Sequence, residues 1–270
     1  MSPVSAILSI TEEPTYSARL GNHAITGLTV SSKWEGLTKY TDRAGQHLIV
    51  LDADQRIITA SPDIIAQLGA HHQSVDGMRF GAPLAGGYFV GVIEVKGQRY
   101  AVVVSPVVSG EFQGKWNDDV SLVSGATSRC DGLANTKAMA EAGSDLAKAV
   151  LGTTINGYSD WYIPAKDELE MAYRQLKPTQ QTNYADGDDG INPSSIPAGK
   201  AYTKASPEQT TVALFADGGR EAFKAAWYWT SSQHEATAHC AWSQGFNDGF
   251  QLNSHKSAAG RVRAFRRFAI

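Results

Sequence analysis

Three histidines, side chains that often bind zinc, lie close together near the end of the chain. They are His234, His239 and His255. Zinc ligands need a rigid supporting shell, and the two cysteines of the chain, Cys130 and Cys240, show no Cys-x-x-Cys spacing. We expect two free thiols, no bound metal and no cofactor.

Catalytic motifs are missing from the sequence. It contains no Gly-x-Ser-x-Gly segment, no phosphate-binding loop and no convincing pair of carboxylates. The acidic run at residues 186–190 does not fit a calcium-binding EF-hand, because the twelfth residue from Asp186 is Pro197 and not glutamate. We expect a solvated loop there and no enzymatic activity.

Four arginines near the end of the chain raise the question of nucleic-acid binding. The chain carries a net charge of −3, and without the last ten residues the charge is −7, so no general polyanion-binding surface is expected. The arginines alternate with apolar residues as in a strand. We expect them to anchor carboxylates of nearby loops and expect no nucleic-acid partner: Arg261, Arg263, Arg266 and Arg267.

The elements that must position these residues form an α+β pattern. Residues 88–95 and 99–104 read as a buried hairpin. A helix is predicted over residues 135–152 and a second from Pro164 to a point before Pro178. A long irregular segment follows at residues 179–224. Four strands then complete an antiparallel sheet: residues 226–230, 241–246, 250–253 and 261–268.

The first part of the chain has a different character. Residues 1–78 are β-rich but irregular, with a hairpin turn predicted at 52–55 and a short helix at 61–69. We expect residues 1–78 to serve for attachment or oligomerisation and residues 79–270 to form one ligand-binding domain. At 270 residues the chain is long enough for two such parts.

No membrane-spanning segment is predicted. The longest charge-free run, residues 80–93, has 14 residues and includes Pro83, whereas a span needs about 18. The start of the chain lacks a cationic region and a cleavage-like site. We therefore expect no signal peptide, synthesis in the cytoplasm and no membrane insertion.

Several motifs, in order and spacing, carry a family resemblance. They are the segment Gly-Tyr-Ser-Asp-Trp-Tyr-Ile-Pro-Ala-Lys-Asp-Glu-Leu at 157–169, Tyr-Trp-Thr-Ser-Ser-Gln at 228–233, Ala-Trp at 241–242, Gly249 and Arg-Val-Arg-Ala-Phe-Arg at 261–266. Over residues 85–270 the chain resembles the C-type-lectin-like domain at the carboxyl terminus of the Legionella collagen-like adhesin. It is also similar to variable proteins of diversity-generating retroelements, among them phage tail receptor-binding proteins.

The resemblance implies a C-type-lectin-like fold that displays a variable ligand-binding face. In the retroelement proteins, error-prone copying of adenines scatters Asn codons to many residue types but not to Lys, Gln, Glu, Met or Trp. The residues assigned to the variable face are accessible in this way: His234, Thr237, His239, Cys240, Ser243, Gly245, Asn247, Phe250, Leu252, Asn253, His255 and Ser257. The residues assigned to the scaffold are Trp161, Trp229, Trp242, Gln244, Arg261 and Arg263.

Strand alternation predicts which side of residues 241–246 is displayed. Side chains alternate across a strand, so Trp242, Gln244 and Phe246 share one face and the small residues at 241, 243 and 245 share the other. We expect the large residues to be buried and the small ones to face solvent.

The resemblance implies a receptor-binding protein, encoded by a phage or prophage and carried on the virion tail. Its partners would be a bacterial cell-surface protein or glycan, other tail proteins through residues 1–78, and two further copies in a homotrimer. Three alternatives stay open. One is a structural virion component with an invariant lectin-like domain. The second is an oxidase like the formylglycine-generating enzymes. The third is a calcium-dependent lectin. The triplet at residues 116–118 is similar to the calcium-binding triplet of such lectins, but here it precedes both predicted helices instead of following the long loop.

Overall fold

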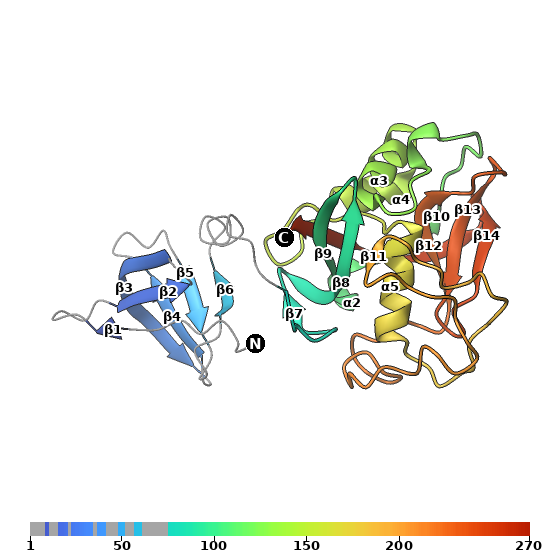
Figure 1. Ribbon diagram of the computed structural model, residues 1–270. Helices are drawn as coiled ribbons and strands as arrows, with labels where there is room; N and C mark the ends of the chain where they lie inside the picture. The colour runs from blue at the N-terminus through green and yellow to red at the C-terminus, as the bar shows by residue number, and fades with distance from the viewer. Residues whose placement is uncertain are drawn as a thin grey trace. The chain divides into compact units, whose positions relative to one another are not determined.

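The computed structural model describes residues 9–10, 16–20, 23–34, 37–41, 48–51, 57–60 and 75–270 (Figure 1). The chain divides into two compact units, Met1–Gly77 and Met78–Ile270. Each unit has its own sheet system, and the candidate site lies in the second.

The first unit contains a six-stranded sheet in which each strand pairs with the next along the chain. All five pairings are antiparallel, as short connections between neighbouring strands require. The strands agree with the β-rich character predicted for residues 1–78, whereas the predicted turn at 52–55 and helix at 61–69 lie outside the described residues. The strands are β1 (Ser9–Ile10), β2 (Tyr16–Leu20), β3 (His23–Trp34), β4 (Leu37–Thr41), β5 (Leu48–Leu51) and β6 (Ile57–Ala60).

The first sheet of the second unit is built on the predicted hairpin of β8 (Gly87–Val95) and β9 (Gln98–Val104). Its two-residue turn has positive φ angles at Lys96 and Gly97, which suits the twist of a tight hairpin. The hairpin lies at the centre of the sheet, between β11 (Ser195–Ile196) on one side and β16 (Phe265–Ala269) on the other. The short β7 (Pro83–Leu84) also pairs with β8.

The second sheet has the order β10-β15-β12-β13-β14. It is antiparallel except for one parallel pairing, between Tyr228 of β12 and Arg261 of β15. β14 ends the sheet on the side away from β10 (Figure 1). The bounds are β10 (Glu111–Lys115), β12 (Trp227–Gln233), β13 (Cys240–Gly245), β14 (Gln251–His255) and β15 (Ala259–Arg263).

The last strand differs from the prediction. One strand was expected over residues 261–268, but the chain leaves the second sheet after β15 and enters the first sheet as β16. Ala264 lies between them, fully buried, donating its N–H to the carbonyl of Gly110 and accepting the N–H of Ser105. Charged and apolar residues alternate only as far as Ala264, since apolar Phe265 follows it and Arg266 and Arg267 are adjacent, so the residue pattern does change at the break.

The predicted helix at residues 135–152 is two helices, α3 (Gly132–Glu141) and α4 (Asp145–Leu151). Gly143 adopts a φ of +100° between them, which a side chain would strain. Ser144 then caps α4 by accepting the N–H of Ala147. The later helix, α5 (Lys166–Leu176), starts and ends close to the predicted bounds. Two short helical turns, α2 (Val107–Gly110) and η1 (Ser124–Ala126), complete the helical elements of the described residues.

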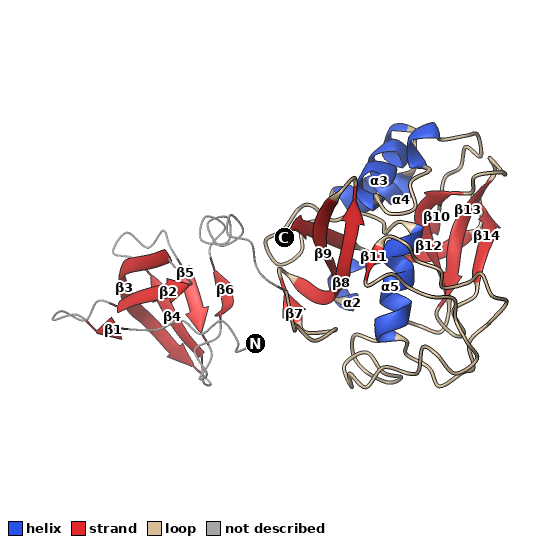
Figure 2. Cartoon of the chain, in the orientation of Figure 1, coloured by secondary structure: helices blue, strands red, loops and turns tan. Residues whose placement is uncertain are grey.

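α5 lies between the two sheets, and α3 and α4 pack at one end of them (Figure 2). One core joins α5 to both sheets and includes Val90, Leu169, Tyr173 and Tyr228. A second core under α3 and α4 contains Trp116, Trp161 and Trp229. The arrangement is an α+β, lectin-like domain, as predicted.

The segment at residues 179–224 has little regular structure, as predicted; among its described residues only β11 is a strand. Buried asparagines hold it to α5. Asn192 donates to the carbonyl of Asp167 and to Glu170 Oε2, at 2.8 and 2.6 Å. Asn183 accepts from the Tyr173 hydroxyl at 2.7 Å. These buried hydrogen bonds give the loop a defined position without secondary structure.

A buried carboxyl at the start of α5 predicts a pH dependence. Glu168 accepts the N–H of Ala165 and the Tyr162 hydroxyl, and burial raises its pKa to about 7. In the unfolded chain the pKa is about 4.3. Protonation of Glu168 therefore stabilises the fold fully below about pH 4.3, and this contribution is lost as the pH rises through about 7.

We expect the stability of the wild type relative to Glu168→Gln to fall by about 3 kcal/mol between about pH 4.5 and pH 8, at about 1.4 kcal/mol per pKa unit. Urea unfolding of both proteins across this range measures the difference. A difference that does not change with pH would contradict the prediction.

Candidate functional site

The predicted variable residues lie on β13, on β14 and in the turns beside them. Five are exposed: His239, Leu252, Asn253, His255 and Ser257. Five are half-buried: His234, Thr237, Cys240, Asn247 and Phe250. Two are buried: Ser243 and Gly245. Ten of the twelve thus reach the surface in some measure, and their role in binding stays a prediction.

The predicted face assignment of β13 is correct for Gln244 and Phe246, which are buried, and wrong for the small residues and for Trp242. Ser243 is only 3% exposed, because it stands opposite Trp229 of β12 and its hydroxyl bonds to the hydroxyl of Ser254 at 2.8 Å. Gly245 is buried as well, whereas Trp242 is half-buried and reaches the surface. Neither side of β13 is therefore open as a whole, since Gln244 is buried on the side of Trp242 and the exposed Leu252 of β14 stands opposite Ser243.

The other predicted scaffold residues support the sheet from within. Trp161, Trp229, Gln244 and Arg263 are buried, and Arg261 is half-buried. The prediction that the arginines anchor loop carboxylates is confirmed for Arg263, Arg266 and Arg267, whereas Arg261 pairs with a carboxylate of the neighbouring strand β10. The pairs are Arg261 with Glu111 at 2.6 Å, Arg263 with Glu221 at 2.9 Å, Arg266 with Asp160 at 2.7 Å and Arg267 with Asp131 at 2.6 Å.

An exposed aromatic cluster lies at one end of β13 and β14. It consists of Tyr184, Trp227 and Phe250, with ring centroids 4.2 Å apart for Tyr184 and Phe250 and 6.0 Å apart for Trp227 and Phe250. Tyr184 is 42% and Trp227 40% exposed, and Leu252 beside them is 38% exposed. Adjacent exposed apolar side chains of this kind mark interaction surfaces.

The long loop holds this end of the sheet in place. Tyr184 donates its N–H to the carbonyl of Asp248, and the Thr179 hydroxyl donates to the carbonyl of Asn247 at 2.6 Å. These bonds fix the turn between β13 and β14. The aromatic cluster therefore has a firmly positioned backbone on both sides.

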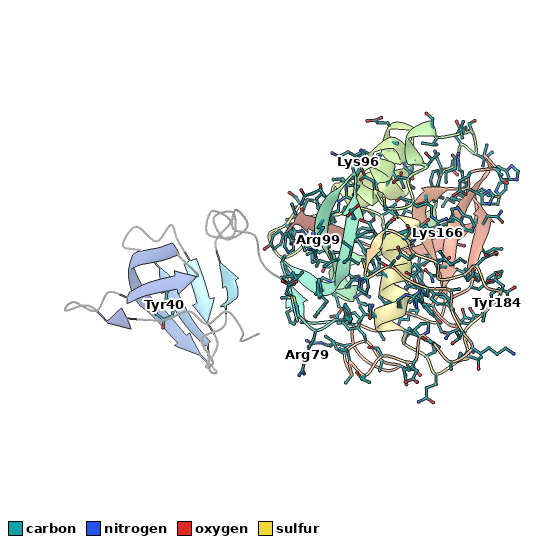
Figure 3. The ribbon with its side chains drawn as sticks, viewed as in Figure 1. Tyr40, Arg79, Lys96, Arg99, Lys166 and Tyr184 are labelled. Carbon is teal, nitrogen blue, oxygen red and sulfur yellow. The ribbon has the colours of Figure 1, made fainter. Side chains whose placement is uncertain are left out.

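A polar group surrounds Trp242 near the start of α5, where Figure 3 labels Lys166. The Lys166 ammonium lies 3.3 Å from the centre of the Trp242 ring. The indole donates to Glu235 Oε2 at 3.0 Å, and the His234 ring lies 4.9 Å away. Burial, with a smaller contribution from the charge of Arg129, lowers the pKa of Lys166 to about 8.

Asp189 ties the long loop to the edge strand. Its Oδ2 accepts the N–H of Gln251 at 3.0 Å. Burial raises the pKa of the Asp189 carboxyl to about 6, although the bond from Gln251 acts in the opposite direction. The carboxylate is therefore ionised at neutral pH, where its charge strengthens this bond.

The three histidines considered for zinc are not brought together. His239 and His255 have ring centroids 5.5 Å apart, but His234 packs against Trp242. Within the described residues, no group of three His, Cys, Asp or Glu side chains could hold a metal ion. Cys130 and Cys240 are free and half-buried.

Three residues of this surface were missed by sequence reasoning. Trp227 had a signal, because it shares a strand face with Trp229 and begins that strand. Tyr184 and Lys166 had none, since packing between distant segments brings Tyr184 to Phe250 and the buried Lys166 to Trp242. Figure 3 shows Tyr184 beside the edge of the second sheet.

Comparison with known proteins places the second unit in a family. The family described as "Lcl C-terminal domain" matches residues 113–266. The chain belongs to this family. The resemblance to the carboxyl-terminal domain of the Legionella collagen-like adhesin is thereby confirmed, and the second unit of this Lcl C-terminal domain protein is of the adhesin type.

Other comparisons add little to this assignment. No curated protein matches the chain. One solved structure with similarity is that of a fimbrial protein from Bacteroides ovatus ATCC 8483, with 11% identity and a TM-score of 0.35. The match covers 98% of this chain and 57% of that one. No helix among the described residues is long and apolar enough to cross a membrane.

Proposed function

We propose that the second unit of this Lcl C-terminal domain protein is the receptor-binding domain of an adhesin, and that it binds a ligand on a bacterial cell surface through the aromatic cluster and the neighbouring residues of β14. The observation that carries the proposal is the aromatic cluster itself. Tyr184, Trp227 and Phe250 are partly exposed and in mutual contact, and aromatic anchors of this kind dominate binding energies at protein surfaces.

The support beneath the cluster favours recognition without refolding. Gln244 lies under it, buried, and donates to the Tyr202 hydroxyl at 3.0 Å and to the carbonyl of Gly249. The backbone of the turn is therefore held by interior groups, while Phe250 and Leu252 reach solvent. Exchange of the outer side chains would leave this framework intact.

We expect Trp227→Ala and Phe250→Ala each to weaken binding of the full chain to bacterial cells by about tenfold or more, the loss typical of an interface anchor. Because both side chains are partly exposed, the loss of stability should stay near about 1 kcal/mol. Flow cytometry with labelled protein on a panel of strains, followed by titration on a strain that the wild type binds, measures the effect.

Phe80→Ala is the matched control. Phe80 is an aromatic residue that is 38% exposed, and it stacks on Phe89 of the first sheet instead of joining the cluster. In Figure 3 its neighbour Arg79 lies on the other side of this unit from Tyr184. Equal loss of binding in all three variants, or in none, would contradict the proposal.

The finer proposal is a phage or prophage tail protein with a diversified face. Its support is the resemblance, together with the full or partial exposure of ten of the twelve adenine-accessible positions and the burial of Gln244, Gln251 and Lys256, whose residue types such copying cannot produce. Residues 1–78 would attach it to the virion as a homotrimer, whose three sites raise avidity. A neighbouring reverse-transcriptase gene with an imperfect copy of this segment would support diversification; an invariant segment across isolates would oppose it.

A further inference from the structure

β14 differs from the other outer strands of the second unit. Natural proteins protect sheet edges with charges, prolines or very short strands. β10 carries Glu111 and Lys115, β16 carries Arg266 and Arg267, and β7 and β11 have two residues each. β14 has five residues, Gln-Leu-Asn-Ser-His, without a charged residue or proline. Among the described strands of this unit, it is the outer strand with none of these protections.

The register of β13 and β14 shows which backbone groups point to the free edge. Gly245 donates to the carbonyl of Phe250, and Lys256 donates to that of His239. Between these two pairs the register is regular, so Leu252 and Ser254 direct their N–H and C=O groups to β13. Those of Gln251, Asn253 and His255 point outward.

Two of the outward-pointing backbone groups of β14 already have hydrogen-bond partners. Gln251 N–H is bound by Asp189, and the carbonyl of His255 accepts the N–H of Ala258. Within the described residues no hydrogen bond is recorded for the N–H and C=O of Asn253, the carbonyl of Gln251 or the N–H of His255. The free edge is thus centred on Asn253 and closed at both ends, and Asn253 is exposed.

We propose that β14 binds an extended segment of a receptor protein, which adds as a sixth strand along Asn253. This inference rests on the proposed receptor-binding function and names its partner as a polypeptide strand. In an antiparallel arrangement, a residue opposite Asn253 would exchange two backbone hydrogen bonds with it. The residues two positions before and after that one would bond to the N–H of His255 and the carbonyl of Gln251.

The aromatic cluster defines the side chains of that segment. Leu252 and Phe250 share one face of β14, and Trp227 stands on the same face of the sheet, opposite Gly245. The residues on either side of the one paired with Asn253 would direct their side chains to this face. The segment therefore carries apolar residues at alternate positions.

A second copy of this chain fits the edge less well. Its own β14 would bring a second Asp189 and a second turn at residues 256–258 to the same few positions. Asp189 and this turn already occupy the two ends of the edge in each copy. A receptor segment that carries no such groups can pair along the whole free part of β14.

Asn253→Pro tests the proposal. Proline removes the outward N–H of residue 253 and places its ring at the edge, yet the β13 to β14 hydrogen bonds do not use that N–H. Asn253→Ala is the matched control, because it removes the side chain and keeps the N–H. The probe is a displayed library of random peptides about 12 residues long, enough to span a strand of typical length, selected for binding to the full wild-type chain.

We expect the selected peptides to carry alternate apolar residues and to bind Asn253→Pro at least about tenfold more weakly than Asn253→Ala, which also lacks the amide side chain but keeps the N–H. A second measurement uses only the wild type: amide hydrogen exchange at Asn253 should slow at least about tenfold when a selected peptide is bound. This measurement decides the matter even if the proline variant folds poorly.

Three results would overturn the proposal directly: no peptide is selected, the selected peptides bind folded Asn253→Pro normally, or the peptide leaves hydrogen exchange at Asn253 unchanged. A change of oligomeric state in Asn253→Pro would also overturn it, because it would identify a second copy of the chain as the occupant. Cell binding separates this inference from the proposed function. If Asn253→Pro binds cells normally while Trp227→Ala and Phe250→Ala do not, the receptor-binding function stands and the added strand is rejected.

Discussion

Replacing Trp229 by alanine is expected to lower the free energy of unfolding of the second unit by about 3–5 kcal/mol. Trp229 is 2% exposed and packs in the core under α3 and α4. It lies so close to β15 that a Cβ on Gly260 would come within 2.6 Å of its Nε1. A cavity of this size in a tightly packed core cannot collapse without moving both strands.

Trp242→Ala serves as the comparison, because the sequence alone does not show that Trp242 is less buried than Trp229. Trp242 is half-buried, and one side of its ring is covered by the Lys166 ammonium. Its removal should cost about 1 kcal/mol. Guanidinium unfolding of both variants, followed by circular dichroism, measures the difference; losses of equal size would mean that the burial of these two rings has been assigned incorrectly.

Breaking the ion pair between Arg263 and Glu221 should have an effect of similar size. Arg263 is fully buried and Glu221 is 6% exposed. The guanidinium donates to Glu221 Oε2 at 2.9 Å and to the carbonyl of Ser105 at 2.7 Å. Arg263→Met leaves a buried carboxylate without its counter-charge, and we expect a loss of about 3–5 kcal/mol.

The double variant Arg263→Met with Glu221→Gln separates the charge from the packing. The amide oxygen that the second change introduces can still accept the N–H of Val107, which Glu221 accepts at 2.7 Å. Because the double variant has no unpaired buried charge, it should lose at most half as much stability as Arg263→Met. A double variant as unstable as Arg263→Met would show that the buried charge is not the cause.

Much of the second unit follows from local sequence. The hairpin of β8 and β9, the helix α5 and the strands of the second sheet each carry their own periodicity, turn residues or caps. Lys96 and Gly97 mark the hairpin turn, and the charged pair at Asp167 and Glu168 marks the start of α5. The arginines of the last strands also predicted their own partners, because a buried guanidinium needs a carboxylate.

The breaks at Gly143 and Ala264 could not be predicted in the same way. The apolar spacing of residues 135–152 continues across Gly143. The alternation of residues 261–264 ends where Phe265 follows Ala264, but this change does not show that the chain enters another sheet. Each break depends on a distant group: Ser144 bonds to the carbonyl of Trp116, and Ala264 bonds to Gly110 and Ser105. Such partners are known only when the chain is folded.

The same distinction between local sequence and tertiary contacts applies to the candidate surface. The sequence by itself determined that Trp242 and Ser243 point to opposite sides of one strand, because alternation is a local property of the extended backbone. Only the tertiary structure decided which positions on each side reach solvent. Trp229 covers Ser243, although Leu252 on the same side is exposed, and the long loop brings Tyr184 into contact with Phe250, far along the chain. Burial depends on what packs across a strand, and those contacts are set by segments far away in sequence.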